Sequence, residues 1–220
     1  MPRSARRVVP GLAHHITQRG TNRQTVFFAR RDRRVYLDLL RDQASKTGVR
    51  ILAYCLMNNH IHLIAIPCEE DALAVCLRRV HGRYAQYLNA RRGRTGHLWQ
   101  NRFFSCPLDA AHLLTALRYV ECNPVRAGLV ATPVEFAWSS AVAHGSGKDQ
   151  SRLLDMQFWE DQGGLVFWQQ LLHSEEDETE YQRLRRATYS GRPLGSVEQR
   201  AVSRRTSGSE VQAKSHRGAA

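Results

Sequence analysis

The sequence predicts an α+β protein, built as an antiparallel sheet with helices packed on one face. Strand-like and helix-like segments alternate, two of the strands adjoin across an asparagine turn, and the helical segments carry apolar residues at helical spacing. The order is strand, helix, strand, strand, helix, strand, helix, which suits a ferredoxin-like (RRM-like) sheet containing a split βαβ unit. A C-terminal helical extension follows this core.

The first half of the chain supplies three of the strands and one helix. Residues 12–19 contain β-branched residues and are expected to form a strand. A helical pattern covers 32–48, and the apolar run at 49–57 predicts a second strand. The two asparagines at 58–59 indicate a hairpin turn, because asparagine tolerates left-handed backbone. The returning strand is expected at 60–66, where a proline stops it.

The next segments complete the predicted core. Apolar spacing predicts a helix over 71–89, followed by a basic, glycine-punctuated loop at 91–96. An aromatic stretch at 99–108 predicts the last strand. Asp109 is a suitable N-cap for a third helix, which should end before Pro124 because the residue preceding proline disfavours helical backbone.

The composition changes after about residue 145, and this change predicts the domain organisation. Residues 1–145 would form the main domain, and 146–195 a helical extension with amphipathic segments at 153–172 and 175–187. Residues 196–220 contain few apolar side chains and are expected to be disordered.

The charge is strongly basic and unevenly distributed. The formal net charge is +12 and the pI about 10.2, and only three of the 32 basic residues are lysines. Residues 1–34 hold nine arginines and one acid, and residues 78–102 hold seven arginines and no acid. Such blocks favour phosphate contact, although a GC-rich genome would also enrich arginine. The candidate phosphate-binding residues are Arg19, Arg23, Arg78, Arg79, Arg83 and Arg102.

Apolar runs and cysteines bear on the compartment. No apolar run approaches the roughly 20 residues needed to span a membrane, and the basic N-terminus lacks the apolar region of a secretory signal. We therefore expect a cytoplasmic protein without a membrane partner. The five cysteines are an odd number without a Cys-x-x-Cys pair, which supports neither a disulfide framework nor a zinc ribbon.

His60 and His62 flank one apolar residue in the predicted hairpin. Side chains two positions apart in a strand share a face, so both imidazoles should point the same way and Ile61 should point into a core. Imidazole is the commonest metal ligand, so this pair could form half of a metal site. The alternative is a half-exposed strand whose histidines have no role.

Tyr119 and Asn123 lie four residues apart in the third predicted helix. This spacing places them on one helical face, about 5–6 Å apart at Cβ. A phenol beside an amide oxygen ligand suits tyrosine attack on a metal-polarised phosphodiester, and oxygen ligands suit Mg²⁺ or Mn²⁺. The alternative is that Tyr119 packs in the core and Asn123 merely ends the helix.

Several motifs together resemble the HUH single-tyrosine transposases, specifically the REP-associated tyrosine transposase branch. The match extends over about residues 8–142, in the order and spacing of that family. The segments that carry it are 14–20 (HHITQRG), 53–57 (AYCLM), 60–62 (HIH), 97–103 (HLWQNRF), 118–129 (RYVECNPVRAGL) and 138–140 (WSS). The chain has Asn58 where relatives usually have proline, and we expect little effect because asparagine also suits a turn.

The resemblance implies a specific function and site. His60 and His62 would bind a divalent cation, Mg²⁺ or Mn²⁺, and Asn123 would complete that site. Tyr119 would attack single-stranded DNA bearing a hairpin (REP- or BIME-like), forming a 5′-phosphotyrosine and releasing a 3′-hydroxyl. The protein would then act at the nucleoid, and both monomers and homodimers occur among similar proteins.

Three alternatives compete with these assignments. Tyr84 and Tyr87 are also near basic residues, but their spacing suits a core stripe and neither is followed four positions later by a ligand-type residue. Of His14 and His15, at most one can reach the site, because adjacent strand residues face opposite ways. The whole chain could instead be a non-catalytic module that binds structured single-stranded DNA or RNA, since sheets of this kind are reused for binding.

Overall fold

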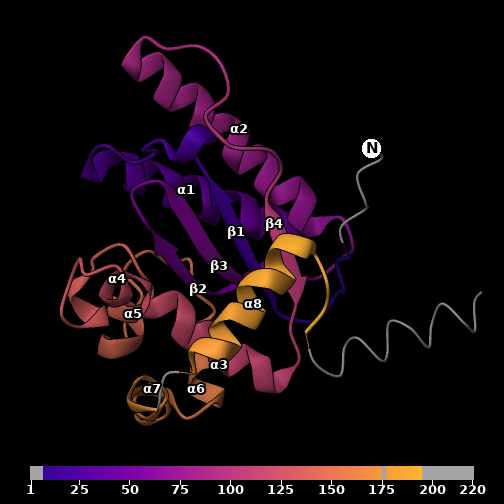
Figure 1. The fold of residues 1–220 in the computed structure, drawn as a ribbon, viewed down its shortest axis with the longest axis vertical. Coiled ribbons are helices and arrows are strands. Elements are labelled where there is room, and N and C mark those ends of the chain that lie inside the picture. The colour runs from indigo at the N-terminus through magenta and orange to yellow at the C-terminus, as the bar shows by residue number, and fades with distance from the viewer. Residues whose placement is uncertain (1–6, 175–176, 195–220) are drawn as a thin grey trace, which may run out of the picture.

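The computed structural model of this chain describes residues 7–174 and 177–194 (Figure 1), so the predicted tail at 196–220 lies outside the described residues. The elements of the core are β1 (His14–Arg19), η1 (Thr21–Arg23), α1 (Arg30–Thr47), β2 (Val49–Leu56), β3 (His60–Pro67), α2 (Ala72–Arg92), β4 (Phe104–Pro107) and α3 (Ala110–Glu121). They are followed by α4 (Asn123–Arg126), η2 (Pro133–Glu135), α5 (Ala141–Ser146), α6 (Met156–Asp161), α7 (Gly164–His173) and α8 (Glu178–Ser190).

The four strands form one antiparallel sheet in the order β2-β3-β1-β4. β3 lies between β1 and β2, which is the split βαβ arrangement, and the predicted α+β fold class is confirmed. In the central pair, Thr17 lies opposite His62 and Arg19 lies opposite His60. This register brings the ends of β1 and β3 together on one face.

α1 and α2 cover one face of the sheet, as predicted for the helices of the core. The inward residues of β3, namely Ile61, Leu63 and Ala65, are fully buried in the cluster that these helices form with the sheet. Tyr84 of α2 is also fully buried there, and its hydroxyl donates to the Val26 carbonyl at 2.6 Å. Tyr84 is therefore a core residue, as its helical spacing indicated.

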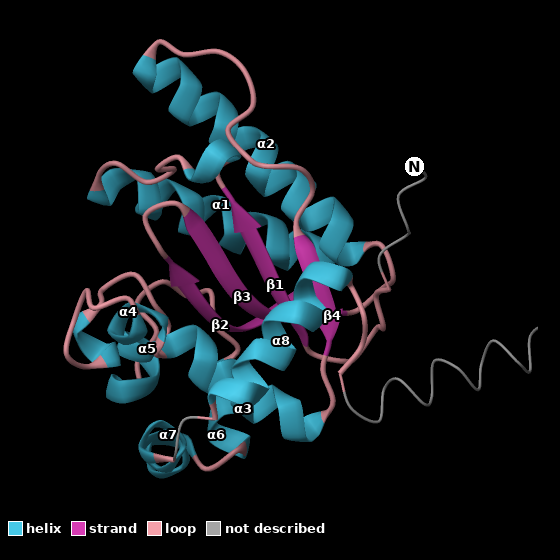
Figure 2. Cartoon of the chain, in the orientation of Figure 1, coloured by secondary structure: helices cyan, strands magenta, loops and turns pink. Residues whose placement is uncertain are grey.

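Helices also cover the opposite face of the sheet, in addition to the one face that the sequence predicted. α3 packs on β2 and β3, and α8 packs on β4 and β1, so the sheet lies between two helical layers (Figure 2). Leu52, Cys55 and Ile64 point into this second core. A bulge in β2, where the pairing with β3 shifts between Ile51 and Ala53, turns the Leu52 side chain toward α3 and into this second core.

Several predicted boundaries are corrected by the structure. The last strand begins at Phe104 rather than at residue 99, because Asn101 adopts left-handed backbone (φ 60°) and interrupts the extended chain. The amphipathic segment expected at 153–172 contains two helices, since Gly163 has φ 110° between them. The division at residue 145 stays a prediction, and α8 of the proposed extension packs directly on the core sheet.

Neither a membrane-spanning helix nor a disulfide occurs among the residues that the structure describes. Within residues 7–174 and 177–194, no helix combines the length and the apolar character that crossing a bilayer requires. All five cysteines are free, and only Cys68 is exposed.

Candidate active site

His60 and His62 project from β3 on the face that α3 and α8 cover. Their ring centroids are 5.0 Å apart, while Ile61 between them is buried in the other core. His60 is half-buried and His62 is only 6% exposed. The alternation of the strand thus places the two imidazoles side by side at the wall of a pocket.

Tyr119 reaches the same pocket from α3. Its ring centroid lies 5.4 Å from that of His62, and the two rings meet edge to face. Asn123 begins α4 one turn later, where its amide nitrogen donates to the Tyr119 carbonyl at 3.4 Å. These four side chains line one pocket of about 240 Å³. They all belong to one chain, so the pocket requires no second copy.

The hydrogen bonds of His60 define which of its nitrogens faces the pocket. Asn59 donates its amide nitrogen to the Arg23 carbonyl at 3.1 Å, which orients its amide oxygen toward His60 Nδ1 at 2.6 Å. Because an amide oxygen only accepts, His60 Nδ1 carries the proton and Nε2 keeps a lone pair. Partners of this kind orient metal-ligating histidines.

His62 has a different partner. Its Nδ1 lies 3.0 Å from Nε2 of His15, and the planes of the two rings are nearly parallel (6°). His15 is fully buried and contacts the Thr188 hydroxyl of α8 at 2.7 Å. His14 points to the other side of β1, where its Nδ1 contacts the Leu12 carbonyl at 2.9 Å. Of the adjacent pair, only His15 therefore approaches the site, behind His62.

The donor atoms of the pocket fit a divalent cation. His60 presents an imidazole lone pair and Asn123 an amide oxygen, and the second histidine adjoins them; borderline and hard cations accept this mixed set. No cluster of three or more His, Cys, Asp or Glu side chains that could hold a metal occurs within the described ranges. Asn123 lines the same pocket and could supply an amide oxygen as a further ligand.

Burial and nearby arginines shift the pKa values of the site. Burial lowers the pKa of His60 to about 4, helped by Arg19 and Arg185. Burial also holds the pKa of His62 well below its usual value. Burial raises the pKa of Tyr119, while Arg185, a hydrogen bond with Asn123 and Arg126 each lower it. At neutral pH the histidines are uncharged, as metal ligation requires, and the phenol is protonated.

Sequence comparison identifies the family. The model of the family described as "Transposase IS200 like" matches residues 8–123, more than half of the 220 residues. This chain is a member of the IS200-like transposase family. No curated protein sequence matches it significantly.

Two solved structures resemble the transposase. The structure of a REP-associated tyrosine transposase bound to a REP hairpin has a TM-score of 0.57 and 17% identity, covering 69% of this chain and 90% of that chain. At that identity the likeness establishes the fold alone. A crystal structure assigned as a transposase from Deinococcus radiodurans R1 has a TM-score of 0.39 and 18% identity, covering 55% of this chain and 96% of that chain. The second likeness is too low to support any conclusion.

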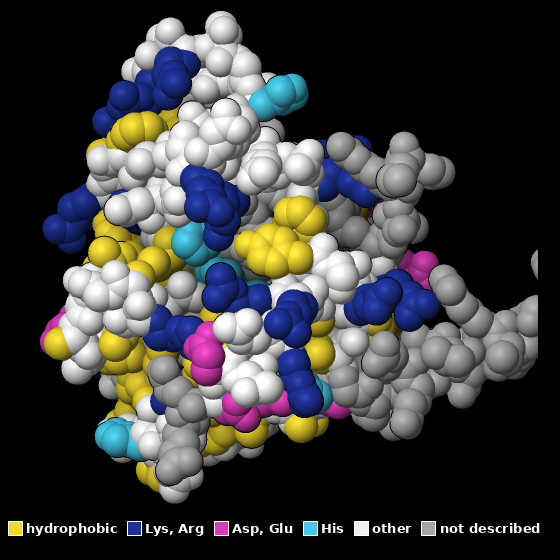
Figure 3. Space-filling view, in the orientation of Figure 1, with side chains coloured by type: hydrophobic (Ala, Val, Ile, Leu, Met, Phe, Trp, Pro, Cys, Tyr) yellow, Lys and Arg dark blue, Asp and Glu magenta, His cyan; other side chains and the backbone are white. Residues whose placement is uncertain are grey.

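Three arginines surround the pocket of the transposase. Arg19 comes from β1, Arg126 from α4 and Arg185 from α8. Arg19 Nε and one terminal nitrogen of Arg126 are buried without a hydrogen-bond partner among the described residues. Buried donors of this kind are rare and suit an anionic ligand such as phosphate. Figure 3 shows histidine side chains between basic side chains near the centre of this face.

The other predicted phosphate-binding arginines lie outside this pocket. Arg78 and Arg102 line a hollow of about 640 Å³ between α2 and the loop that leads to β4, together with Trp99. Arg83 lies 3.8 Å from Asp42, and Arg23 and Arg79 are exposed. Of the six arginines predicted from the sequence, only Arg19 is brought to the active-site pocket.

Sequence analysis missed several side chains of the pocket. Arg126 follows closely on Asn123 and lay within the motif-bearing segment, so its position was a usable signal. Arg185, Thr188 and Tyr189 come from α8, and nothing in the local pattern of that helix distinguishes them from other solvated or packed positions. They reach the site only because α8 folds back on β4.

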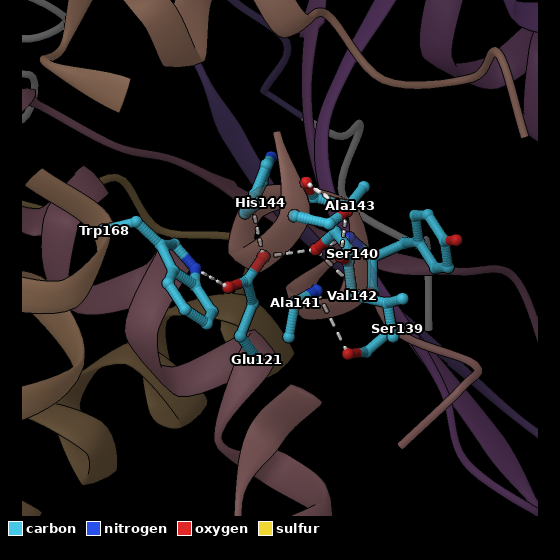
Figure 4. Close-up of polar contacts among 10 residues, drawn as sticks. Glu121, Ser139, Ser140, Ala141, Val142, Ala143, His144 and Trp168 are labelled. Atoms are coloured by element: carbon cyan, nitrogen blue, oxygen red, sulfur yellow. Dashed lines mark hydrogen bonds and ion pairs between the residues drawn. The ribbon is translucent and has the colours of Figure 1, made fainter. Parts of the chain in front are cut away.

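A buried carboxylate anchors the end of α3 that carries Tyr119. Glu121 is 2% exposed and accepts hydrogen bonds from Ser140 at 2.5 Å, from His144 at 2.6 Å, and from the indole of Trp168 (Figure 4). These partners come from α5, its N-terminal flank and α7. The network therefore connects α3 to the helices that follow it.

Proposed function

We propose that this transposase cleaves and rejoins hairpin-bearing single-stranded DNA, with Tyr119 as the nucleophile and a 5′-phosphotyrosine as the intermediate. His60, His62 and Asn123 would hold Mg²⁺ or Mn²⁺ beside it. The observation that supports this most is that Tyr119 lines one pocket with all three proposed ligands. A protein that only binds DNA needs no such combination.

The bonding changes follow from the product. The Tyr119 oxygen forms a bond to phosphorus, and the bond from phosphorus to the 3′ oxygen breaks. The phenol loses a proton and the departing 3′ oxygen gains one, so the step needs no other reactant. Because the phosphotyrosine retains an activated phosphoryl group, a 3′-hydroxyl can later attack it and rejoin the strand.

The arginines of the pocket have two roles in this proposal. Arg185 and Arg126 lower the pKa of Tyr119 and so oppose the effect of its burial. The guanidinium groups of Arg19 and Arg126, which line the pocket, would donate to the non-bridging oxygens of the scissile phosphate. A bound divalent cation would add positive charge beside that phosphate.

The hollow beside α2 is proposed as a contact surface for a flanking single strand. Arg78 and Arg102 offer phosphate contacts and Trp99 an aromatic surface, a combination typical of single-strand binding. Gly82 faces the hollow, and an added Cβ would meet nothing within 4 Å. Glycine inside a helix costs about 1 kcal/mol relative to alanine, so an open glycine here suits close approach of a ligand.

The substrate class is proposed on family grounds as well. The structural neighbour is described as bound to a REP hairpin, and we propose a hairpin of that general kind for this chain. A protein acting on such chromosomal DNA would work at the nucleoid.

Incubation with hairpin-bearing oligonucleotides and Mn²⁺ or Mg²⁺, followed by a denaturing gel, tests the cleavage mechanism. We expect a covalent protein–DNA adduct that Tyr119→Phe abolishes. Tyr189→Phe is the matched control, because it removes the other phenol of the same pocket. An adduct that survives in Tyr119→Phe contradicts the proposal. Binding without cleavage in either metal would favour the non-catalytic alternative.

Salt-dependent binding tests the hollow separately. Arg78→Ala and Arg102→Ala should each weaken single-strand binding and reduce the slope of log affinity against log salt by about 0.7. Arg83→Ala serves as a control of the same charge change, because Arg83 lies beside Asp42 instead. Equal slopes in all three variants would exclude the hollow as a DNA contact.

A further inference from the structure

A network of buried hydrogen bonds connects His62 of β3, through His15 of β1, to Thr188 of α8. His62 Nδ1 lies 3.0 Å from His15 Nε2, and His15 Nδ1 lies 2.7 Å from the Thr188 hydroxyl. The Thr188 hydroxyl donates to the Leu184 carbonyl at 2.7 Å within α8. His15 and Thr188 are at most 1% exposed, so water does not compete for these bonds.

The proton positions along this hydrogen-bond network follow from its end at Thr188. In the structure the single hydroxyl proton of Thr188 is directed to the Leu184 carbonyl, which only accepts, and the Cys106 thiol, with Sγ 3.3 Å away, can donate to the same Thr188 oxygen. Thr188 must then accept from His15, which places the His15 proton on Nδ1. Burial keeps His15 neutral, since no carboxylate contacts it, so its Nε2 accepts from His62.

The proton shared between His62 and His15 decides the tautomer of His62. With its Nδ1 donating to His15, His62 keeps a lone pair on Nε2, the nitrogen on the other side of the ring. His60 reaches the same state independently, through Asn59. Both histidines therefore present an unprotonated Nε2, which a metal site built on this pair needs.

We propose that His15 and Thr188 are positioning residues that hold His62 in the tautomer able to bind metal through Nε2, so that α8 completes the metal site. The inference rests on the proposed metal site of His60, His62 and Asn123. Thr188 lies outside the residues 8–123 that match the family model, so the extension contributes directly to the site.

A purely structural role makes a different prediction. Were Thr188 and His15 only a buried polar pair that fastens α8 to the sheet, their loss would lower stability and leave the tautomer of His62 unchanged. Thr188→Val separates the two roles, because valine has nearly the shape of threonine and lacks the hydroxyl. Thr188→Ser keeps the hydroxyl, and Thr179→Val makes the same change at an exposed position of α8.

The first measurement is Mn²⁺ binding to the full chain by calorimetry, without DNA. Loss of an outer hydrogen-bond partner typically weakens metal binding about 10–100-fold, and we expect Thr188→Val to fall in that range. Thr188→Ser and Thr179→Val should bind Mn²⁺ like the parent protein. Unchanged affinity in Thr188→Val, at a temperature where circular dichroism shows it folded, would overturn the inference.

The second measurement is the histidine tautomer in metal-free protein, read from long-range ¹H–¹⁵N correlations of the imidazole rings. We expect His62 protonated at Nδ1 in the parent protein and in Thr188→Ser, and a mixture of tautomers in Thr188→Val. A parent protein with His62 protonated at Nε2 contradicts the inference even if Thr188→Val fails to fold. Failure of the parent protein to bind Mn²⁺ would instead overturn the proposed metal site, while the tautomer measurement still decides the role of Thr188.

Discussion

Replacing Glu121 by glutamine tests how the end of α3 that carries Tyr119 is held. The Glu121 carboxylate receives three hydrogen bonds, from Ser140, His144 and Trp168. Ser140 and His144 share one carboxylate oxygen, and the Trp168 indole uses the other. A glutamine side chain has nearly the same shape but presents an NH₂ group in place of one oxygen.

The expected loss of stability follows from those contacts. In either orientation the new NH₂ group faces at least one existing donor, so at least one hydrogen bond to a carboxylate is lost, at about 1.5–3 kcal/mol. A buried donor without a partner costs about 1–3 kcal/mol more. The free energy of unfolding should fall by about 3–5 kcal/mol. For a chain of this size each kcal/mol lowers Tm by about 2–4 °C, which gives a decrease of roughly 10 °C.

Thermal unfolding followed by circular dichroism provides the measurement. Glu160→Gln is the matched control, because Glu160 is exposed on α6, and it should leave Tm nearly unchanged. A decrease in Glu121→Gln of less than about 2 °C relative to that control would refute the hydrogen-bond argument. We also expect slower adduct formation in Glu121→Gln at temperatures where it is folded, because Glu121 lies between Tyr119 and Asn123.

Two further predictions concern pH. Burial lowers the folded-state pKa of His14 to about 4, of His15 to about 3 and of His60 to about 4, from 6.5 in the unfolded chain. The protonation of these histidines therefore has no effect on stability above pH 6.5. As pH falls below 6.5, the unfolded chain binds protons that the folded protein does not, and the free energy of unfolding decreases by about 2 kcal/mol per histidine at pH 5. Equal urea midpoints at pH 7 and pH 5, with a chelator present, would contradict this. Arg185 lowers the pKa of Tyr119, so Arg185→Ala should move the rise of the cleavage rate to higher pH, whereas an unshifted profile, identical to that of Arg186→Ala, would exclude this electrostatic role.

Local periodicity in the sequence determined the parts of the site that lie on single elements. Alternation along β3 predicts that His60 and His62 share a face and that Ile61 enters the core, and the structure has this arrangement. Helical spacing likewise brings Asn123 against Tyr119. These predictions depend only on backbone geometry within a few residues, which the amino-acid pattern expresses directly. The metal and nucleophile roles of these residues stay predictions.

Only the tertiary structure decided which distant side chains join that site. The sequence indicated that at most one of His14 and His15 could reach it, and the strand register and the position of α8 decided for His15. Arg185 and Thr188 follow His62 by more than 100 positions, and no local pattern marks them. Their place depends on how α8 packs against β4 and β1, which is set by burial of apolar surface over the whole helix. Local pattern thus predicted which of these side chains share a face, and long-range packing brought the distant groups that surround them.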